Sequence, residues 1–392
     1  MDSSDDERDV NAEASTPNEP KRTKFVDDVL NGPNEAYMEN FRMDKHVFHR
    51  LCDMLRTRGL LHHTNRIKIE EQLAIFLFIA GHNLRTRAVQ ELFKYSGETI
   101  SRHFNNVLSA IMTVSLDYFQ PPKSDVPPQI REDPRVYPYF MNCVGAVDGI
   151  HFPVTVGVDE QGPFRDKNGF LSQSVLAACS FDMKFNYVLA GWEGSAPHML
   201  VLNSALTRCN KLEVPHGKYY LVDSKYANIP GLIAPYPGVS YSHLEFGGGV
   251  HPQDARELFN ERHSILHSVA NRTFSALKER FPILMSAPSY PLATQVKLVV
   301  AACALHNYIR DENPADWIFK MYEQEGVMQM EDPLMAALET DEQPLIVPFE
   351  TRMECVAVGD EELEHASRTR DAIATEIWND YVRDFIAIDH VL

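Results

Sequence analysis

Apolar residues recur at helical spacing along the first part of the chain. Between residues 43 and 112 they form successive groups, and within a group the spacing is that of one face of an α-helix, three or four positions. The positions that carry this pattern are Phe48, Leu51, Leu55, Leu73, Phe76, Leu77, Ala80, Leu92, Phe93, Ile100, Phe104 and Leu108. The pattern predicts an all-helical domain over residues 40–118.

The end of this domain has the spacing of a helix-turn-helix motif. Two helical segments, Thr86–Lys94 and Glu98–Ala110, are separated by the short turn Tyr95–Gly97. The basic side chains around the motif are Arg85, Arg87, Lys94, Arg102 and His103. DNA contact through residues 86–110 is one interpretation, and a structural hairpin with solvated charges is the other.

A different pattern follows the proline-rich residues 119–137, which are predicted to be a linker. Short apolar runs predict strands at Met141–Val147, Ser172–Phe181, Tyr187–Trp192 and Tyr219–Val222. Longer periodic segments predict helices at Met199–Arg208 and Gln253–Arg280. Strands mixed with helices favour an α/β domain over residues 138–312.

Charge is distributed unevenly over the 392 residues. The whole chain carries 37 basic and 55 acidic side chains, a formal net charge of -18. Residues 45–104 carry ten basic and five acidic side chains, whereas residues 1–35 and 311–366 are acidic. Their low apolar content predicts that residues 1–35 are disordered and that residues 313–366 are largely so. The net charge argues against a simple nucleic-acid binder, because it repels phosphate.

Short signals bear on the cellular compartment. Pro20–Lys24 could be a nuclear import signal or a solvated basic patch, and the motif alone does not separate the two. Six cysteines lie far apart without a C-x-x-C pair, which favours free thiols in a reducing compartment. The first residues lack an apolar leader, and no run reaches 18 uncharged apolar residues. We therefore expect neither secretion nor a membrane span.

Two aspartates follow apolar strands of the predicted sheet. Asp148 comes directly after Met141–Val147, and Asp223 after Tyr219–Val222. Residues at strand ends project where open α/β sheets bind ligands, and paired carboxylates suit Mg²⁺ or Mn²⁺ in phosphodiester hydrolysis. The alternative is that Asp148-Gly149 is an ordinary turn.

Five blocks of sequence resemble, in order and spacing, the PIF/Harbinger transposase family and its host-domesticated relatives. The blocks are VGAVDGIH (144–151), LAACSFDMKFNYVLAGWEGSA (176–196), KYYLVDSKYANIPGLIAPYPGVSY (218–241), LFNERHSILHSVANRTFSALKERFPIL (258–284) and ALHNYIRDE (304–312). The resemblance implies an RNase H-like nuclease core that uses an Asp, Asp, Glu triad on divalent metal. It also implies a pre-catalytic helical domain and a C-terminal helix over residues 367–392.

The family triad carries over only in part. Asp148 and Asp223 match the two aspartates, but the glutamate position is Asn271, with 47 residues between 223 and 271 as in the family. Lys225 stands where relatives have glycine, and the block Gly194–Leu200 lacks the family's acid and base. We expect a weakened Mg²⁺ or Mn²⁺ site, because asparagine offers a neutral oxygen.

Two histidines fall near the expected metal site. His151 follows Asp148 by three residues, and His263 precedes Asn271 on the same predicted helix. Each could serve the site or be a hydrogen-bonded structural histidine.

The resemblance is nearest in kind to plant proteins of the antagonist-of-like-heterochromatin-protein type. It implies a nuclear protein, also present in the cytoplasm, that acts without nuclease activity as a scaffold or accessory subunit of a chromatin-regulatory complex. A Myb/SANT-like partner would supply most DNA contact. The alternatives are an active divalent-metal endonuclease of the Harbinger type and a DNA-binding protein acting through residues 86–110.

Overall fold

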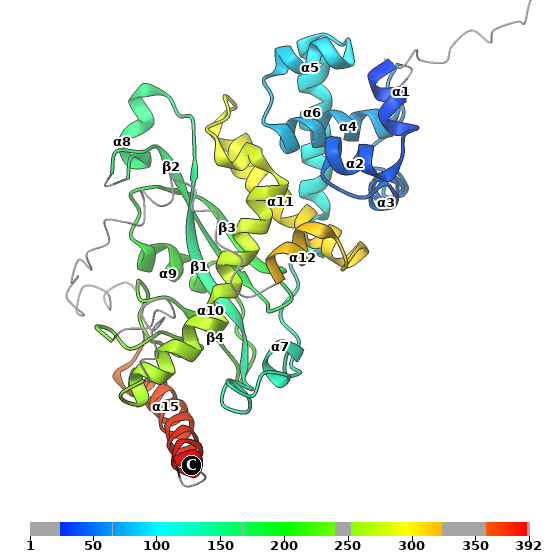
Figure 1. Cartoon of the computed structure of the whole chain (residues 1–392). Coiled ribbons are helices and arrows are strands. Elements are labelled where there is room, and N and C mark those ends of the chain that lie inside the picture. The colour runs from blue at the N-terminus through cyan, green and yellow to red at the C-terminus, as the bar shows by residue number, and fades with distance from the viewer. Residues whose placement is uncertain (1–23, 65, 167, 240–251, 324–357, 390–392) are drawn as a thin grey trace, which may run out of the picture.

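The computed structural model describes residues 24–389, apart from residues 65, 167, 240–251 and 324–357. A helical region forms the upper part of the molecule and an α/β region the lower part (Figure 1). The helices of the upper region are α1 (Lys24–Leu30), α2 (Asn34–Phe41), α3 (Lys45–Thr57), α4 (Ile69–His82), α5 (Thr86–Phe93) and α6 (Gly97–Val114). This confirms the helical character predicted for the N-terminal part.

Helix α4 is the centre of the helical region. It is apolar on nearly every face and packs against α2, α3, α5 and α6. The turn between α5 and α6 ends at Ser96, whose hydroxyl caps α6 by accepting from the Thr99 N–H.

The N-terminal acidic segment is partly folded, contrary to the predicted disorder of residues 1–35. Residues 24–35 form α1 and the start of α2, while residues 1–23 lie outside the described part of the chain. Val26, Val29 and Leu30 are buried in the core. Their helical spacing outweighs the acidic composition around them.

The segment between the two regions lies on the protein. It contains the 3₁₀-helix η1 (Ser115–Asp117) and the short helix α7 (Pro128–Arg131). Ile130 and Val136 are completely buried. The proline-rich residues 119–137 are therefore packed against the core over part of their length.

Five strands form one mixed sheet in the order β3-β2-β1-β4-β5. They are β1 (Cys143–Pro153), β2 (Ser172–Cys179), β3 (Phe185–Glu193), β4 (Tyr219–Val222) and β5 (Leu232–Ile233). β1, β2 and β3 are antiparallel neighbours, whereas β4 and β5 run parallel to β1. The short strand β5 was not predicted. The insertion between β1 and β2 carries η2 (Val158–Glu160) and α8 (Gln161–Phe164).

Helices cover both faces of the sheet. Helices α10 (Ala255–Arg280) and α11 (Leu292–Glu312), joined through η3 (Pro282–Met285), pack on one face, and α9 (His198–Thr207) lies on the other. Strand β1 accordingly sends side chains into two cores, and an irregularity at residues 143–145 interrupts the strict alternation at its start. Ala146 and Ile150 enter the main core beneath α10, and Val144 and Val147 enter the second core beneath α9.

Helix α11 is long and apolar enough, by length and composition, to cross a membrane. About two-thirds of the most apolar 18-residue stretch of α11 is buried inside the protein. The helix packs against β3 and α6. These contacts are those of a core helix, so its composition is explained without a membrane.

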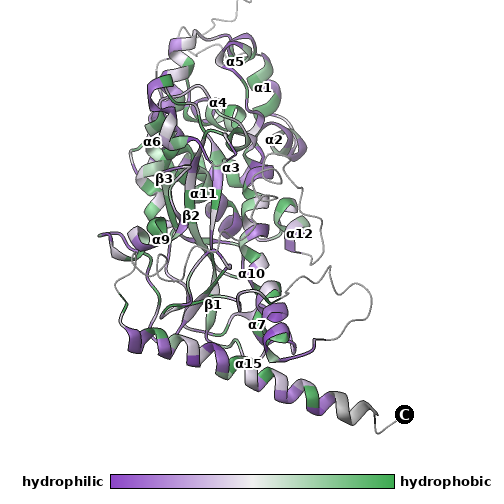
Figure 2. Ribbon diagram, turned by 90° about the vertical axis from the view of Figure 1, so that its left-hand side faces the viewer, coloured by the Kyte–Doolittle hydropathy of each residue, from purple (hydrophilic) through white to green (hydrophobic). Residues whose placement is uncertain are grey.

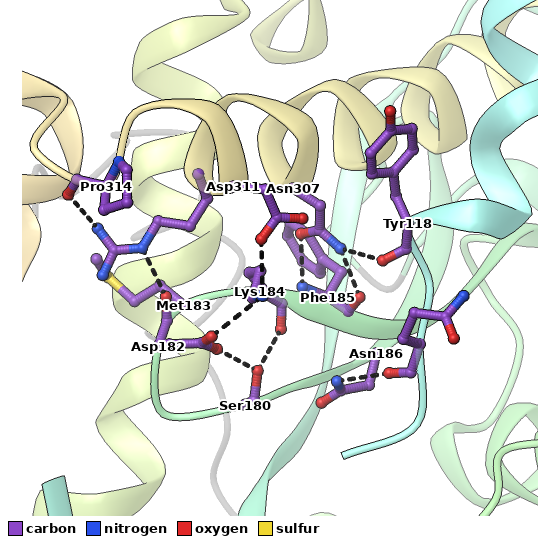
Figure 3. Close-up of polar contacts among 12 residues, drawn as sticks. Tyr118, Ser180, Asp182, Met183, Lys184, Phe185, Asn186, Asn307, Asp311 and Pro314 are labelled. Atoms are coloured by element: carbon purple, nitrogen blue, oxygen red, sulfur yellow. Dashed lines mark hydrogen bonds and ion pairs between the residues drawn. The ribbon is translucent and has the colours of Figure 1, made fainter. Parts of the chain in front are cut away.

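Asn307 of α11 joins β3 to the segment that follows η1 (Figure 3). Its Oδ1 accepts from the Phe185 N–H at 2.8 Å, and its Nδ2 donates to Phe185 O at 2.7 Å and Tyr118 O at 2.9 Å. The nearby turn is fixed by Lys184, which pairs with Asp311 at 2.9 Å. One amide thus satisfies backbone groups from two parts of the chain.

A buried ion pair ties three segments together. Arg280, at the end of α10, pairs with Asp316 and also donates to the backbone carbonyl of Arg42. Both charged side chains are completely inaccessible to solvent. The ring of Phe319 in α12 (Trp317–Glu323) lies 5.2 Å from the guanidinium.

The C-terminal helix is longer than expected. Helix α15 (Asp360–Asp389) begins seven residues before the predicted residue 367 and lies along the lower side of the sheet (Figure 2). Residues 317–323 and 360–366 are helical, although we expected residues 313–366 to be largely disordered. The rest of that segment, residues 324–357, lies outside the described residues. Ile373 and Ile377 bury one face of α15 against the main core.

Candidate active site

The sheet brings Asp148 and Asp223 to the same level on neighbouring strands. β1 and β4 are parallel, and Val147 is opposite Val222, so the two aspartates are the next residues along. Adjacent strands lie about 4.8 Å apart, which sets the separation of the two backbones. Asp148 is 8% exposed and lies on the face that carries the main core.

Asp148 lies within β1 and not at its end. We expected the strand to stop at Val147, yet Asp148 pairs with Ala177 and Gly149 with Leu176, and the strand continues to Pro153. The turn interpretation of Asp148-Gly149 is therefore wrong. The apolar side chains of residues 150 and 152 alternate with the residues between them and extend the strand.

Burial and like charge both act on Asp148. Burial raises its pKa, and the neighbouring carboxylate of Asp223 raises it further. The charges of Lys225 and His267 oppose this shift, as does the Gly149 N–H, which donates to Asp148 Oδ1 at 2.7 Å. Burial and the neighbouring carboxylate thus favour the neutral form of Asp148, and the nearby positive charges favour its ionised form.

His267 is a site residue that the sequence analysis missed. It lies in α10, and its Nε2 is 3.3 Å from the carbonyl oxygen of Val147, next to Asp148. Its ring stacks on that of His263 with centroids 5.8 Å apart. A usable signal existed, because His267 precedes Asn271 by four residues and so shares its side of the helix.

The predicted histidines lie in different surroundings. His263 is buried in α10, its Nε2 is 3.1 Å from Ile233 O, and burial lowers its pKa to about 3. His151 lies in β1, with Nδ1 3.0 Å from the hydroxyl of Ser172 and its ring 6.1 Å from that of His198. Both make the hydrogen bonds expected of structural histidines.

Asn271 lies on α10 one turn after His267, and its side chain is exposed. The other predicted contact residues lie in the helical region, away from the aspartates (Figure 1). Of these, Arg85, Arg87, Lys94 and Arg102 are exposed around α5 and α6, whereas His103 is buried.

The donor set at the aspartates does not fit a divalent metal ion. Hard cations bind several oxygen ligands with enough negative charge to replace their water. Here Asn271, at the position that the family resemblance gives to the third acid, is a neutral and exposed amide, and Lys225 Nζ lies 3.2 Å from Asp223 Oδ2. In the part of the chain that the structure describes, His, Cys, Asp and Glu form no group of three or more that could hold a metal.

Comparisons with known proteins match two parts of the chain to family models. Residues 147–307 match the DDE superfamily endonuclease model, and residues 18–113 match a domain of unknown function, DUF8040. The first match contains all three triad positions. No solved structure matches the chain significantly.

Curated relatives share this similarity over most of their length. The antagonist of like heterochromatin protein 1 of Arabidopsis thaliana is 24% identical over 300 residues, covering 70% of this chain and 73% of that protein. An ALP1-like protein of the same plant is 25% identical, covering 63% of this chain and 62% of the relative. The candidate nuclease HARBI1 of Mus musculus is 26% identical, covering 62% and 68%.

Proposed function

This chain belongs to the transposase-derived family of Harbinger-type, nuclease-like DDE proteins, and on that premise we propose that it is a nuclear accessory subunit that does not cleave DNA. Its folded core acts as a scaffold for other proteins of a chromatin-regulatory complex.

The observation that carries the proposal is the charge at the three triad positions. Asp148 lies in β1 and Asp223 directly follows β4, but Asn271 supplies no charge and is exposed on α10. Two-metal hydrolysis needs carboxylates that hold both ions. A site with two acids and a nearby lysine supports the loss of this chemistry.

The fold supports a scaffold role. The five-stranded mixed sheet, with helices on both faces and a helical region before it, is consistent with the RNase H-like fold that the family implies. Its main core runs without interruption from α1 to α15. A protein freed from catalysis can keep such a core, because folding depends on packing and not on the site.

The charge distribution supports partners that are proteins. Residues 311–366 carry sixteen acidic and two basic side chains, which suit the basic faces of a Myb/SANT-like partner. The name of the Arabidopsis thaliana relative refers to a heterochromatin protein, which agrees with a nuclear setting. Such association weakens as salt screens the charges.

Two measurements test the proposal. Purified protein is incubated with duplex DNA and Mg²⁺ or Mn²⁺, beside the Asp148→Ala variant, and a pull-down from nuclear extract is made at low and high salt. We expect no cleavage by either form and salt-sensitive recovery of chromatin proteins. Cleavage by the wild type that the Asp148→Ala variant lacks would refute the proposal in favour of an active endonuclease.

Direct DNA contact through α6 is a second candidate, favoured by the outer face of that helix. Between residues 99 and 116 the chain has no acidic residue, although its net charge is -18. The exposed side chains of this face are Ser101, Arg102, Asn105, Asn106, Ser109 and Thr113. Arginine and asparagine are the residues that most often read base edges in the major groove.

A gel-shift assay separates the two candidates. The double variant Arg102→Ala/Asn106→Ala is compared with Arg383→Ala, which removes an exposed charge from α15. If α6 reads DNA, the double variant loses binding and Arg383→Ala keeps it. If the protein is recruited only through partners, the wild type alone shifts no DNA at physiological salt.

A further inference from the structure

Lys225 engages both oxygens of Asp223. Its ammonium lies 3.2 Å from Oδ2, and its backbone N–H donates to Oδ1 at 2.8 Å. The side chains are 23% and 22% exposed, so the pair is largely shielded from water. A cation of the protein itself therefore lies against a carboxylate at a triad position.

The turn after β4 holds the lysine in this place. The Tyr226 N–H donates to Asp223 O at 3.2 Å, which folds the chain back over the aspartate. Tyr226 is 2% exposed and packs in the second core. Its hydroxyl lies 2.6 Å from where a Cβ on Gly149 would be, so β1 and the turn fit closely together. Lys225 thus lies in a turn that is held by a backbone hydrogen bond and by the packing of the next residue in the second core.

One ammonium acts on two carboxylates. Besides its ion pair with Asp223, Lys225 interacts electrostatically with Asp148, which the parallel register of β1 and β4 brings beside Asp223. A divalent ion between the aspartates would meet this positive charge at close range and would have to displace it.

We propose that Lys225, paired with Asp223, is a resident counter-ion that takes the place of a divalent metal at the aspartate pair and makes the pair insensitive to metal. This inference rests on the proposed function, because it explains how a chain that does not cleave DNA keeps two neighbouring carboxylates. The alternative is that Lys225 and Asp223 form an ordinary surface ion pair. Such a pair would have the same geometry, but removing the lysine would not change the affinity of the site for a metal ion.

The test is a Mn²⁺ titration of the full-length protein. Calorimetry measures the affinity for Mn²⁺, and thermal unfolding with and without Mn²⁺ measures the shift of the unfolding midpoint. Lys225→Met removes the counter-ion, and Lys218→Met is the matched control, because it removes the same charge near the start of β4, where Lys218 hydrogen-bonds Asn142. We expect Lys225→Met to bind Mn²⁺ at least about tenfold more tightly than wild type and to unfold at a higher temperature when Mn²⁺ is present. Wild type and Lys218→Met should not respond.

Further variants define the outcomes. Lys225→Arg keeps the charge and should stay insensitive to Mn²⁺, and Asp148→Asn should abolish the gain when combined with Lys225→Met. Lys225→Gln replaces Lys225→Met if that variant does not fold. Equal Mn²⁺ affinity of wild type and the uncharged variant overturns the inference. DNA cleavage by wild type would overturn the proposed function, whereas the Mn²⁺ titration decides the role of Lys225 separately.

Discussion

Replacing Asp316 by alanine is expected to be among the most costly single changes in this protein. The substitution leaves the guanidinium of Arg280 in a site from which solvent is excluded. Burial already lowers the pKa of Arg280, and the carboxylate of Asp316 is the main influence that opposes this shift. After the change, the remaining contacts of the cation are the Arg42 carbonyl and the ring of Phe319.

The magnitude follows from these contacts. Breaking a buried ion pair by removing one partner costs about 3–5 kcal/mol, because an uncompensated charge remains. Asp316 Oδ1 also accepts from the Ile318 N–H at 3.1 Å at the start of α12, and losing such a cap costs about 1 kcal/mol. The sum, about 4–6 kcal/mol, is a large part of the 5–15 kcal/mol typical of folded proteins.

Urea unfolding followed by circular dichroism measures this cost. The double variant Arg280→Met/Asp316→Ala should be more stable than Asp316→Ala alone, since no buried charge is left. Asp311→Ala is the control for charge, because it breaks the exposed pair with Lys184 and should cost less than about 1 kcal/mol. If Asp316→Ala costs no more than this control, or if the double variant is the least stable, the reasoning about the buried charge is refuted.

Three further predictions concern buried groups. Burial lowers the pKa of His306 to about 3, below the value of 6.5 in the unfolded chain, so His306 by itself should lower the free energy of unfolding by roughly 2 kcal/mol between about pH 7 and pH 5. His263, whose pKa is lowered to a similar value, adds to this loss. Unfolding measured at each pH should therefore show a smaller fall in His306→Gln than in wild type. Gly145→Ala should yield little soluble protein, because φ at this residue is +156° and the new Cβ would lie 2.0 Å from Cys179 O. Gly162→Ala is the control and should express normally, because a Cβ at Gly162 would meet no described atom within 4 Å. Asn307→Leu should lower the thermal midpoint by several degrees, since it leaves two buried backbone groups of Phe185 and the partly buried carbonyl of Tyr118 without this partner. An unchanged midpoint would contradict this.

Local sequence predicted the elements whose apolar pattern is strong. β4 was predicted with its observed ends, and α9 and α10 within one or two residues. The predicted strand ends at Val147, before the observed end of β1 at Pro153, because Asp148-Gly149 has the composition of a turn. Residues 150 and 152 nevertheless continue the alternation of apolar side chains. β5 has two residues and no periodic signal, since its existence depends on pairing with β4.

The sequence supplied candidate residues for the site but not the contacts that these residues make. Resemblance pointed to Asp148, Asp223 and Asn271, and the register of β1 and β4 then explains why the two aspartates are neighbours. The hydrogen bond of His267 depends on how α10 crosses the sheet, and the ion pair of Lys225 depends on the turn after β4. Both contacts depend on the three-dimensional arrangement of the chain, so the spacing of residues along the sequence does not predict them.

The last helix lies beside one edge of the sheet. β5 is the edge of the sheet on its side, and an edge strand offers unpaired backbone groups to other chains. Arg370 of α15 donates to the carbonyl oxygens of Ala234 and Pro235, 3.3 Å from each, directly after this strand. Helix α15 thereby blocks the route by which a second sheet could add to the first, so a chain shortened before residue 360 should form intermolecular aggregates even where its core still folds.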